Sequence, residues 1–372
     1  MGRHMNTAAA LDARTSTSEQ SPPGEEQLRF IRNFHDVFLS IGLGLFTLGL
    51  GFVTSLLLAE NMAVQSFSDL RRAGWIVALA YFADAAILWA AAELFARSRR
   101  LFLPSIVILV GFAGFVFAGM ISAYAVLFID QDYDSWEQAA RNLRFMPLAL
   151  LVATTVAVFA YYVRMKLPFA MGLGGALAAT SGVAGAFALA PEAALGSLTL
   201  LQFLAGLFLF GLGIAFDARD PTRQTRFSDN AFWLHFFAGP LIFSAVMTMV
   251  SGGGLMFAED GPFVIRDNIG GSATLTLAVV LVFAVISLLI NRRALLVSGL
   301  LSAAVAIGVL VRQSGLDGLW TGAVTLLLLG SVMVLLGGGW NAMRRILLAP
   351  FPKSGPISRI FPPPVPAGGG ES

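Results

Sequence analysis

Long apolar blocks alternate with short polar segments along most of the chain. Ten such blocks can be distinguished, at residues 37–59, 74–96, 101–129, 146–163, 168–190, 194–216, 231–251, 272–291, 294–311 and 318–340. A helix of about 20 apolar residues crosses the hydrocarbon core of a bilayer, and most of these blocks reach or approach that length. The pattern therefore predicts an all-α, polytopic membrane protein with about ten transmembrane helices.

The basic residues between the blocks orient this chain in the membrane. If the N-terminus is cytoplasmic, 18 of the 24 lysines and arginines fall in inner segments and 6 fall in outer segments. Cytoplasmic loops of membrane proteins carry an excess of lysine and arginine. The distribution therefore predicts that both termini are cytoplasmic.

Two polar segments flank the apolar region. Residues 1–36 include the stretch "SPPGEE", and we expect a disordered cytoplasmic segment there. Residues 341–372 form a tail rich in proline and glycine, which from Ala349 onward reads "APFPKSGPISRIFPPPVPAGGGES". Its prolines oppose helix and favour polyproline II, so we expect a plain cytoplasmic tail, with binding to the groove of a partner as the alternative.

Three of the inner turns resemble one another. They read "ARSRRLFLPS", "VRMKLPFAMG" and "INRRALLVSG", and each joins two blocks through two or three basic residues. Together with the long outer loops after the third and seventh blocks, they suggest a parallel four-helix repeat, with residues 101–216 as one unit and 231–340 as the other. The alternative is that positively charged inner turns look alike because the topology requires them.

Composition agrees with the membrane assignment and removes several classes of function. The chain is 57% hydrophobic and 12% charged, whereas soluble domains are roughly 25% charged. It has no cysteine, which excludes disulfides, thiolate metal sites and cysteine nucleophiles. Its formal charge of +2 is small and its basic residues lie in turns, so we expect no nucleic-acid surface. The expected partners are the lipid bilayer and either another membrane protein or further copies of this chain.

Motifs of enzymes and metal sites are missing from the sequence. There is no H-E-x-x-H, no G-x-S-x-G and no P-loop, so we expect no enzymatic activity and no cofactor. The outer loop "IDQDYDSWEQAARN" spaces its aspartates like the start of a calcium loop. Ser135 and Arg141 stand where such a loop needs glycine and glutamate, so we expect no metal there.

Asp84 is the first candidate for a functional residue inside the membrane. An aspartate at the middle of a membrane helix costs on the order of 2.5–3.5 kcal/mol, so such residues are functional candidates by default. Asp84 is ten residues into the block 74–96, which places it roughly 15 Å deep at about 1.5 Å per residue. Tyr81 lies on the same helix face and can donate a hydrogen bond to it. Asp84 is either a proton or cation site, or a carboxyl group that locks two helices together.

His235 is the second candidate, within "SDNAFWLHFFAGPLI". It lies about 7 Å from the inner end of its helix, at about 1.5 Å per residue. Pro240 follows five residues later, and its missing N–H predicts a kink beside Gly239. A histidine near a kink can titrate around neutral pH, and the alternative is a neutral histidine bonded to a neighbouring helix. Asp84 and His235 differ in depth by roughly 8 Å, so we expect no direct contact between them.

Glu93 is a weaker candidate near the inner end of the block 74–96. Arg97 follows four residues later, which is the favourable order for an ion pair along a helix. We therefore expect an interfacial pair between these two side chains.

The block 168–190 contains a regular stripe of small residues. They recur at every fourth position, as Gly174, Ala178, Gly182 and Ala186. Small residues allow two membrane helices to approach closely, so we expect this stripe to form a helix contact.

Two segments, "LRFIRNFHDVFLSIG" and "SDNAFWLHFFAGPLI", resemble an uncharacterised family of bacterial polytopic inner-membrane proteins. The resemblance extends over most of the helical part and implies a location in the bacterial inner membrane. That family has no assigned activity, so the resemblance identifies no site. Drug/metabolite exporters also have ten helices and two inner termini, but they combine two inverted five-helix halves, unlike the parallel repeat expected here.

Two functions follow from these observations. The first is a small-solute or proton-coupled transporter with Asp84 as the coupling acid. The alternative is a non-transporting membrane subunit or scaffold of a larger complex. Most blocks contain no polar side chains other than serine and threonine, and a transport route normally needs several polar groups, which favours the alternative.

Overall fold

The structure is a computed structural model of the chain, and it describes most of the apolar region. The described residues are 34–61, 67–129, 136–220, 223, 225–251, 256–258, 261–264, 269–293, 295–296, 304, 307–308, 311, 315, 318–352, 355 and 361–362. The segment 1–33, the aspartates of the first long outer loop and most of the block 294–311 lie outside this described part, so the predictions made for them stay predictions.

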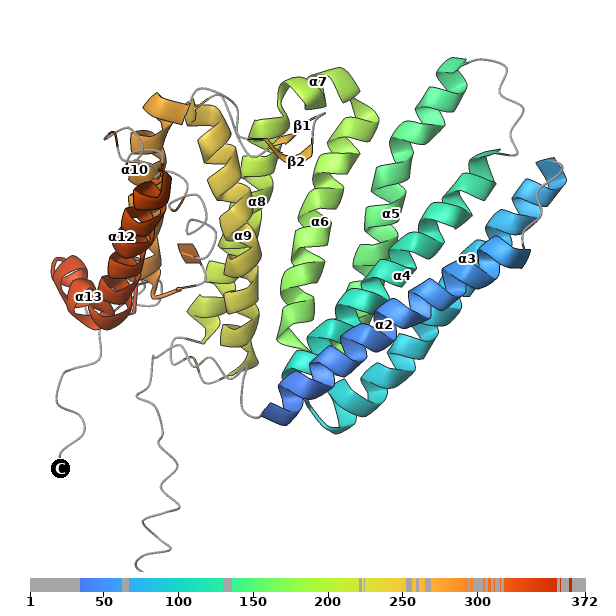
Figure 1. Ribbon diagram of the computed structural model, residues 1–372, viewed down its shortest axis with the longest axis horizontal. Helices are drawn as coiled ribbons and strands as arrows, with labels where there is room; N and C mark the ends of the chain where they lie inside the picture. Colours follow the sequence, from blue (N-terminus) through green and yellow to red (C-terminus); the bar gives the residue numbers. More distant parts are fainter. Residues whose placement is uncertain are drawn as a thin grey trace, which may run out of the picture.

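Helices make up nearly all of the described part (Figure 1). In chain order they are α2 (Phe34–Asn61), α3 (Phe67–Ala92) with the π-helical continuation η1 (Glu93–Ser98), α4 (Phe102–Ile129), α5 (Trp136–Met165), α6 (Pro168–Leu189), α7 (Pro191–Gly196), α8 (Leu198–Arg219), α9 (Arg226–Ser251), α10 (Ile269–Ile290), α12 (Gly318–Gly338) and α13 (Trp340–Leu348). Two short strands, β1 (Met256–Ala258) and β2 (Gly261–Val264), pair antiparallel between α9 and α10.

Several of these helices can cross a membrane. Within the described residues, six are long and apolar enough, and a seventh is added if α12 and α13, which bend by 63° at their junction, form one span. The six spans are His35–Glu60, Arg71–Ser98, Phe102–Phe128, Asn142–Met165, Pro168–Leu189 and Leu198–Arg219. Large apolar side chains such as Leu48, Val156 and Leu335 are exposed on the outside of these helices, as lipid contact requires. The chain is therefore a multi-pass helical membrane protein, while the count of ten, the side of the termini and the repeat stay predictions.

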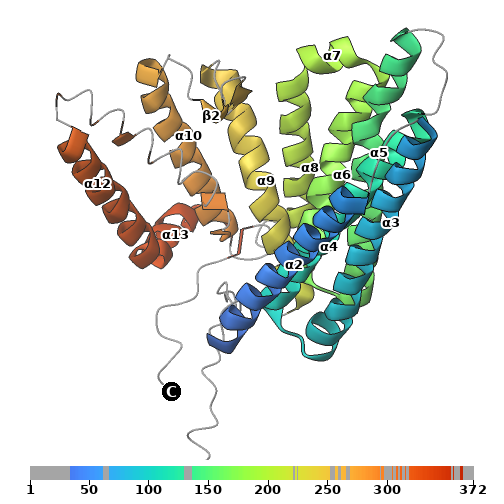
Figure 2. The same ribbon diagram turned by 45° about the vertical axis from the view of Figure 1, so that its right-hand side comes forward.

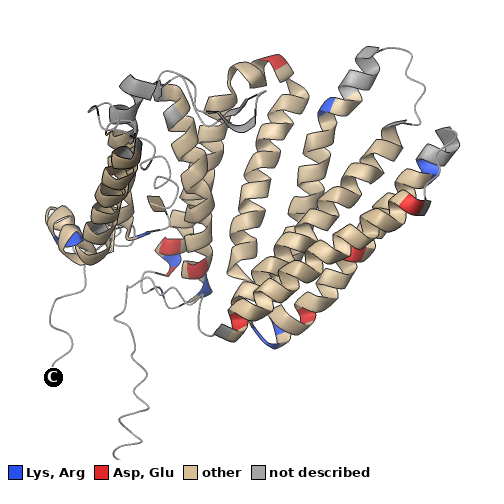
Figure 3. Ribbon diagram, in the orientation of Figure 1, with Lys and Arg blue, Asp and Glu red and all other residues tan. Residues whose placement is uncertain are grey.

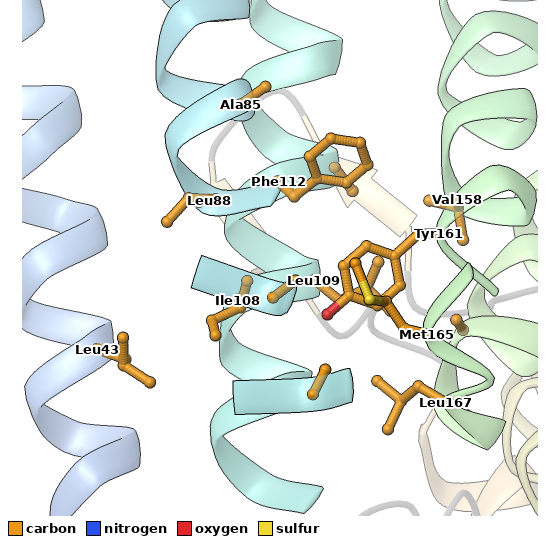
Figure 4. Close-up of a cluster of buried hydrophobic side chains, with 14 residues drawn as sticks. Leu43, Ala85, Leu88, Ile108, Leu109, Phe112, Val158, Tyr161, Met165 and Leu167 are labelled. Carbon is orange, nitrogen blue, oxygen red and sulfur yellow. The ribbon is translucent and has the colours of Figure 1, made fainter. Parts of the chain in front are cut away.

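The helices lie side by side, and two groups of them form apolar cores (Figures 1 and 2). The first core joins α2, α3, α4 and α5 with the start of α6. Figure 4 shows Phe112 and Tyr161 as neighbours in this core. Their ring centroids are 5.8 Å apart. The second core joins α6, α8, α9 and α10 around Leu209, Leu234 and Phe243. Because α6 contacts both α5 and α9, it connects the two groups.

Several helix boundaries differ from those predicted. The helices α2, α3 and α9 begin three to seven residues earlier, at Phe34, Phe67 and Arg226, so the segment expected to be disordered up to residue 36 is helical from Phe34. The helix α5 begins at Trp136, before the predicted residue 146, because its polar first turns continue the helix outside the apolar block. The predicted helix 194–216 begins instead with the separate short helix α7, because Pro191 opens a new helix. The tail predicted from residue 341 begins later, because α13 continues to Leu348.

Four turns that were predicted to be cytoplasmic share an unusual backbone conformation. Arg100, Lys166, Arg223 and Asn291 all have a positive φ, between 53° and 57°, although none is glycine. A left-handed residue ends a helix and reverses the chain. The next residue can then point back into the bundle, as Leu167 does after Lys166. In the third of the similar turns this position is Arg292, which is only 1% exposed.

Candidate functional site

A buried ion pair joins α8 to the turn after α10, at the end of the bundle where η1, α5, α8 and α10 finish. This end is named the basal end. Arg292 donates from Nε to Oδ2 of Asp217 at 3.1 Å, and its Nη2 donates to Oδ1 of the same carboxylate. The contact is bidentate, which is the strongest geometry for such a pair. Figure 3 shows that charged residues are found at this end of α8 and α9.

His235 contacts the same carboxylate from α9. Its Nε2 lies 3.1 Å from Oδ2 of Asp217, and the side chain is 0% exposed. A carboxylate accepts hydrogen bonds only, so Nε2 carries the hydrogen and donates it. Asp217 is therefore shared by a guanidinium group and an imidazole ring.

The helix α8 makes room for this imidazole ring. A Cβ atom on Gly213 would lie only 2.7 Å from Cε1 of His235, so glycine is needed at this position. One turn earlier, Phe210 packs edge-on against the ring at a centroid distance of 5.1 Å. Phe210, Gly213 and Asp217 lie on one face of α8 because they follow helical spacing.

Ser228 of α9 is the second residue that accepts hydrogen bonds from Arg292. Nη2 of Arg292 donates to its carbonyl oxygen at 3.1 Å and to its Oγ at 3.0 Å. Asp217, Ser228, His235 and Arg292 are named the ionic cluster, and they come from α8, α9 and the turn after α10. The cluster thus ties the basal ends of three helices together.

Further hydrogen bonds hold the backbone around the cluster. Arg223 donates to the carbonyls of Ile290 and Asn291, at 2.8 and 2.6 Å, and so caps the end of α10. Nδ2 of Asn230 donates to the hydroxyl of Tyr162 at 2.8 Å, which links α9 to α5. These bonds hold the end of α10, with the turn after it, and the start of α9 in place, and these segments carry Arg292 and His235 of the cluster.

An apolar cavity of about 390 Å³ lies between α8, α9 and α10 next to the cluster, and it is open on the side where Leu207 and Val282 are exposed. Its lining includes Phe203, Phe210, Ile242, Phe283 and Leu295, and it contains no polar side chain. Phe210 contacts both the cavity and His235, and Leu295 follows Arg292 by three residues. The cavity and the ionic cluster therefore share a wall.

Asp84 lies in the other group of helices and is 4% exposed. Thr54 of α2 donates to its Oδ1 at 3.1 Å, and its Oδ2 has no hydrogen-bond partner in the described part of the chain. The predicted bond from Tyr81 is wrong, because the hydroxyl of Tyr81 lies 3.3 Å from Oγ of Ser55 instead. The ring of Tyr81 stacks on Phe115 of α4, which holds it in that direction. Asp84 contacts α2 and His235 contacts α8, so the structure does not bring the two together.

Glu93 forms the predicted pair with Arg97 at 3.0 Å. It also pairs with Arg164 of α5 at 2.7 Å, a contact between helices that the sequence pattern could not indicate. Pro240 lies inside α9, which runs as one helix from Arg226 to Ser251, and the predicted kink at Pro240 stays a prediction. Oγ of Ser244 donates to the carbonyl of Pro240 at 2.8 Å and also accepts a hydrogen bond from Gln202 of α8.

We expect Glu93→Gln to change the thermal unfolding midpoint only slightly. Both of its partners are about half exposed, and water screens ion pairs at such positions. A fluorescence-detected melting curve in detergent measures this change. A large fall in the midpoint would mean that the Arg164 contact is essential for holding η1 against α5.

Three members of the cluster, Asp217, Ser228 and Arg292, were missed by the sequence analysis. Asp217 directly follows the block 194–216 and was not considered as a candidate, and Arg292 was interpreted only as one of the basic residues of an inner turn. The signal for Arg292 is its alignment with the buried Leu167 in the similar turn "VRMKLPFAMG". In the described residues, no group of three or more acidic or histidine side chains could hold a metal ion.

Comparisons with known proteins assign no family to this chain. No protein-family model matches it, and no curated protein matches it either. Its function therefore has to follow from the ionic cluster, the cavity beside it and Asp84.

Proposed function

We propose that this chain is an integral membrane transporter of a small apolar solute, and that protonation of the ionic cluster controls access to the cavity. The observation that carries this proposal is that His235, fully buried, shares the Asp217 carboxylate with Arg292 beside an apolar cavity. The positive-inside distribution supports a cytoplasmic basal end. The resemblance of the segment around His235 to bacterial inner-membrane proteins supports that membrane as its location.

Charge balance explains how the cluster responds to a proton. With a neutral His235, the charges of Asp217 and Arg292 compensate each other. Protonation of His235 adds a second cation beside one carboxylate, and an uncompensated charge in a buried site is costly. Withdrawal of Arg292 towards the cytoplasm relieves that excess. The turn after α10 then separates from α8 and opens the cavity at its base.

Asp84 is a second proton site in this proposal. Its carboxyl group is buried, and only one of its oxygens has a hydrogen-bond partner in the described residues. Such a group inside a membrane is stable when it holds a proton or faces a cation. Because Asp84 belongs to the group of α2, α3 and α4, Asp84→Asn tests its role separately from the ionic cluster.

We expect proteoliposomes that contain the wild-type protein to lose an imposed pH gradient faster than empty liposomes. The variant His235→Gln keeps a hydrogen-bonding amide but takes up no proton, so the gradient should then last as long as in empty liposomes. Trapped pyranine reports the internal pH. The control is His35→Gln, because His35 is exposed at the start of α2 and should be dispensable.

A distance measurement tests the opening step directly and needs no solute. The chain has no cysteine, so cysteines at Arg219 and Arg293, which are both exposed, can carry the only two spin labels. The distance between α8 and the turn after α10 should be longer near pH 5 than near pH 8, the range in which a histidine changes charge. In His235→Gln it should not depend on pH. The proposal would be contradicted if, in the wild type, the distance between the spin labels were the same near pH 5 and pH 8 and the pH gradient lasted as long as in empty liposomes.

A non-transporting membrane subunit is the second candidate. The bonds of the ionic cluster favour it, because Asp217 pairs with both His235 and Arg292 and these contacts hold three helices together. In that case the spin-label distance stays constant, and a second membrane protein co-purifies in gentle detergent at a fixed ratio.

A further inference from the structure

Arg344 of α13 is a buried guanidinium without an acidic partner among the described residues. It lies on the same helix face as Trp340 and Leu348 and is 2% exposed. Its Nη2 donates to the carbonyl of Pro362, and its Nη1 has no hydrogen-bond partner in the described part of the chain. No ion pair found among those residues includes Arg344. A buried charge that is paired only with a neutral carbonyl is unfavourable.

The surroundings of Arg344 add further positive charge. The guanidinium of Arg223 places a second positive charge close to Arg344. The guanidinium carbon of Arg293 lies 5.0 Å from the centre of the Trp340 ring, one helical turn before Arg344. The carboxylates of Asp217 and Asp220 accept hydrogen bonds from other groups, Asp217 from His235 and Arg292 and Asp220 from Thr225.

We propose that Arg344, with Arg223 and Arg293 beside it, binds a phosphate group at the basal surface. The planar fork of a guanidinium matches two phosphate oxygens, and hydrogen bonds between charged groups are stronger than those to a neutral carbonyl. The phosphate would take the place that the Pro362 carbonyl now holds. This site does not depend on whether the chain transports a solute.

The position of α13 favours a phospholipid headgroup as the source of the phosphate. Ile346 and Met343 are exposed on the side of α13 away from the buried face, and they can contact acyl chains. Basic pockets at the ends of membrane helices bind anionic headgroups in this way. Inorganic phosphate has the same chemistry, and the experiment therefore compares the two sources.

The experiment measures binding to the purified full-length protein in gentle detergent. Phosphatidylglycerol, phosphatidylcholine or inorganic phosphate is titrated, and native mass spectrometry and thermal melting are recorded. We expect phosphatidylglycerol to give a single-lipid adduct and to raise the melting midpoint. Arg344→Gln should weaken this binding about tenfold to a hundredfold, the loss expected when a hydrogen bond between charged groups is removed. Arg345→Gln is the matched control, since Arg345 is the exposed neighbour and should bind like the wild type.

The outcomes show whether Arg344 binds a phosphate group and whether that group belongs to a lipid or to a soluble phosphate. Protection by inorganic phosphate at equal concentration would identify a soluble phosphate, whereas protection by phosphatidylglycerol alone supports the lipid. Absence of any adduct and any shift in the wild type would overturn the proposal, as would unchanged binding in Arg344→Gln. If that variant does not fold, Arg344→Lys keeps the charge without the fork. Arg344→Lys should then bind phosphatidylglycerol more weakly than the wild type. Wild-type affinity in Arg344→Lys would contradict the role of the planar guanidinium in binding the phosphate.

Discussion

Arg292→Leu is expected to lower the free energy of unfolding by about 3–5 kcal/mol, the cost of removing one partner of a buried ion pair. The side chains of both Arg292 and Asp217 are buried, so the carboxylate that remains has no water to replace the guanidinium. The two hydrogen bonds to Ser228 are lost as well. Leucine is the informative substitute because Leu167 occupies the corresponding position after Lys166. Unfolding by sodium dodecyl sulfate, followed by circular dichroism, measures the loss.

The neighbouring residue provides the control for this experiment. Arg293→Leu removes the same charge from an exposed position, so its cost should stay within about 1 kcal/mol. The double variant Asp217→Asn with Arg292→Leu should recover part of the stability, because neither charge then remains buried alone. A single-variant cost as small as that of Arg293→Leu would show that water already reaches the pair.

Gly172→Ala is expected to destabilise the contact between α6 and α9 by about 1–3 kcal/mol, the usual cost of overpacking. A Cβ atom on Gly172 would lie 2.6 Å from Cβ of Trp233 and 2.9 Å from its carbonyl carbon and oxygen. Backbone atoms of a helix cannot rotate away, and the Trp233 ring is held by Phe169 at a centroid distance of 4.7 Å. The two helices must therefore separate. The same unfolding titration measures the effect.

A second glycine of α6 gives the matched control. A Cβ atom on Gly182 would have no described neighbour within 4 Å, so Gly182→Ala should leave stability unchanged or raise it by up to about 1 kcal/mol through helix propensity. Equal losses in the two variants would mean that α6 is sensitive to any added methyl group and that the contact with Trp233 is not specific.

Membrane class and many helix boundaries could be predicted from the sequence. The helices α4 and α6 begin and end within one residue of the predicted blocks 101–129 and 168–190. These features depend on the length of an apolar run, which is a local property of the chain. The pair of Glu93 with Arg97 was predictable for the same reason, since residues four apart on a helix are neighbours.

The packing face of α6 could not be predicted in this way. The sequence pattern indicated the stripe that contains Gly174 and Gly182, but Gly182 has no close neighbour among the described residues and Gly174 faces Phe159 of α5. The close approach to α9 is made by Gly172 and Gly175. A helix with small residues on several sides does not reveal which side meets a neighbour, because that depends on the positions of the other helices.

The sequence by itself thus determined that this protein folds as helices in a lipid bilayer. Long apolar runs must form helices there, because every backbone polar group needs a hydrogen-bond partner within its own segment. Tertiary structure alone decided which charges are buried. Asp217 and Arg292 are 75 residues apart, and both follow an apolar block, where charges usually meet water. They pair because the left-handed residue Asn291 turns the next side chain back towards α8. His235 joins them because Gly213 leaves space for its ring.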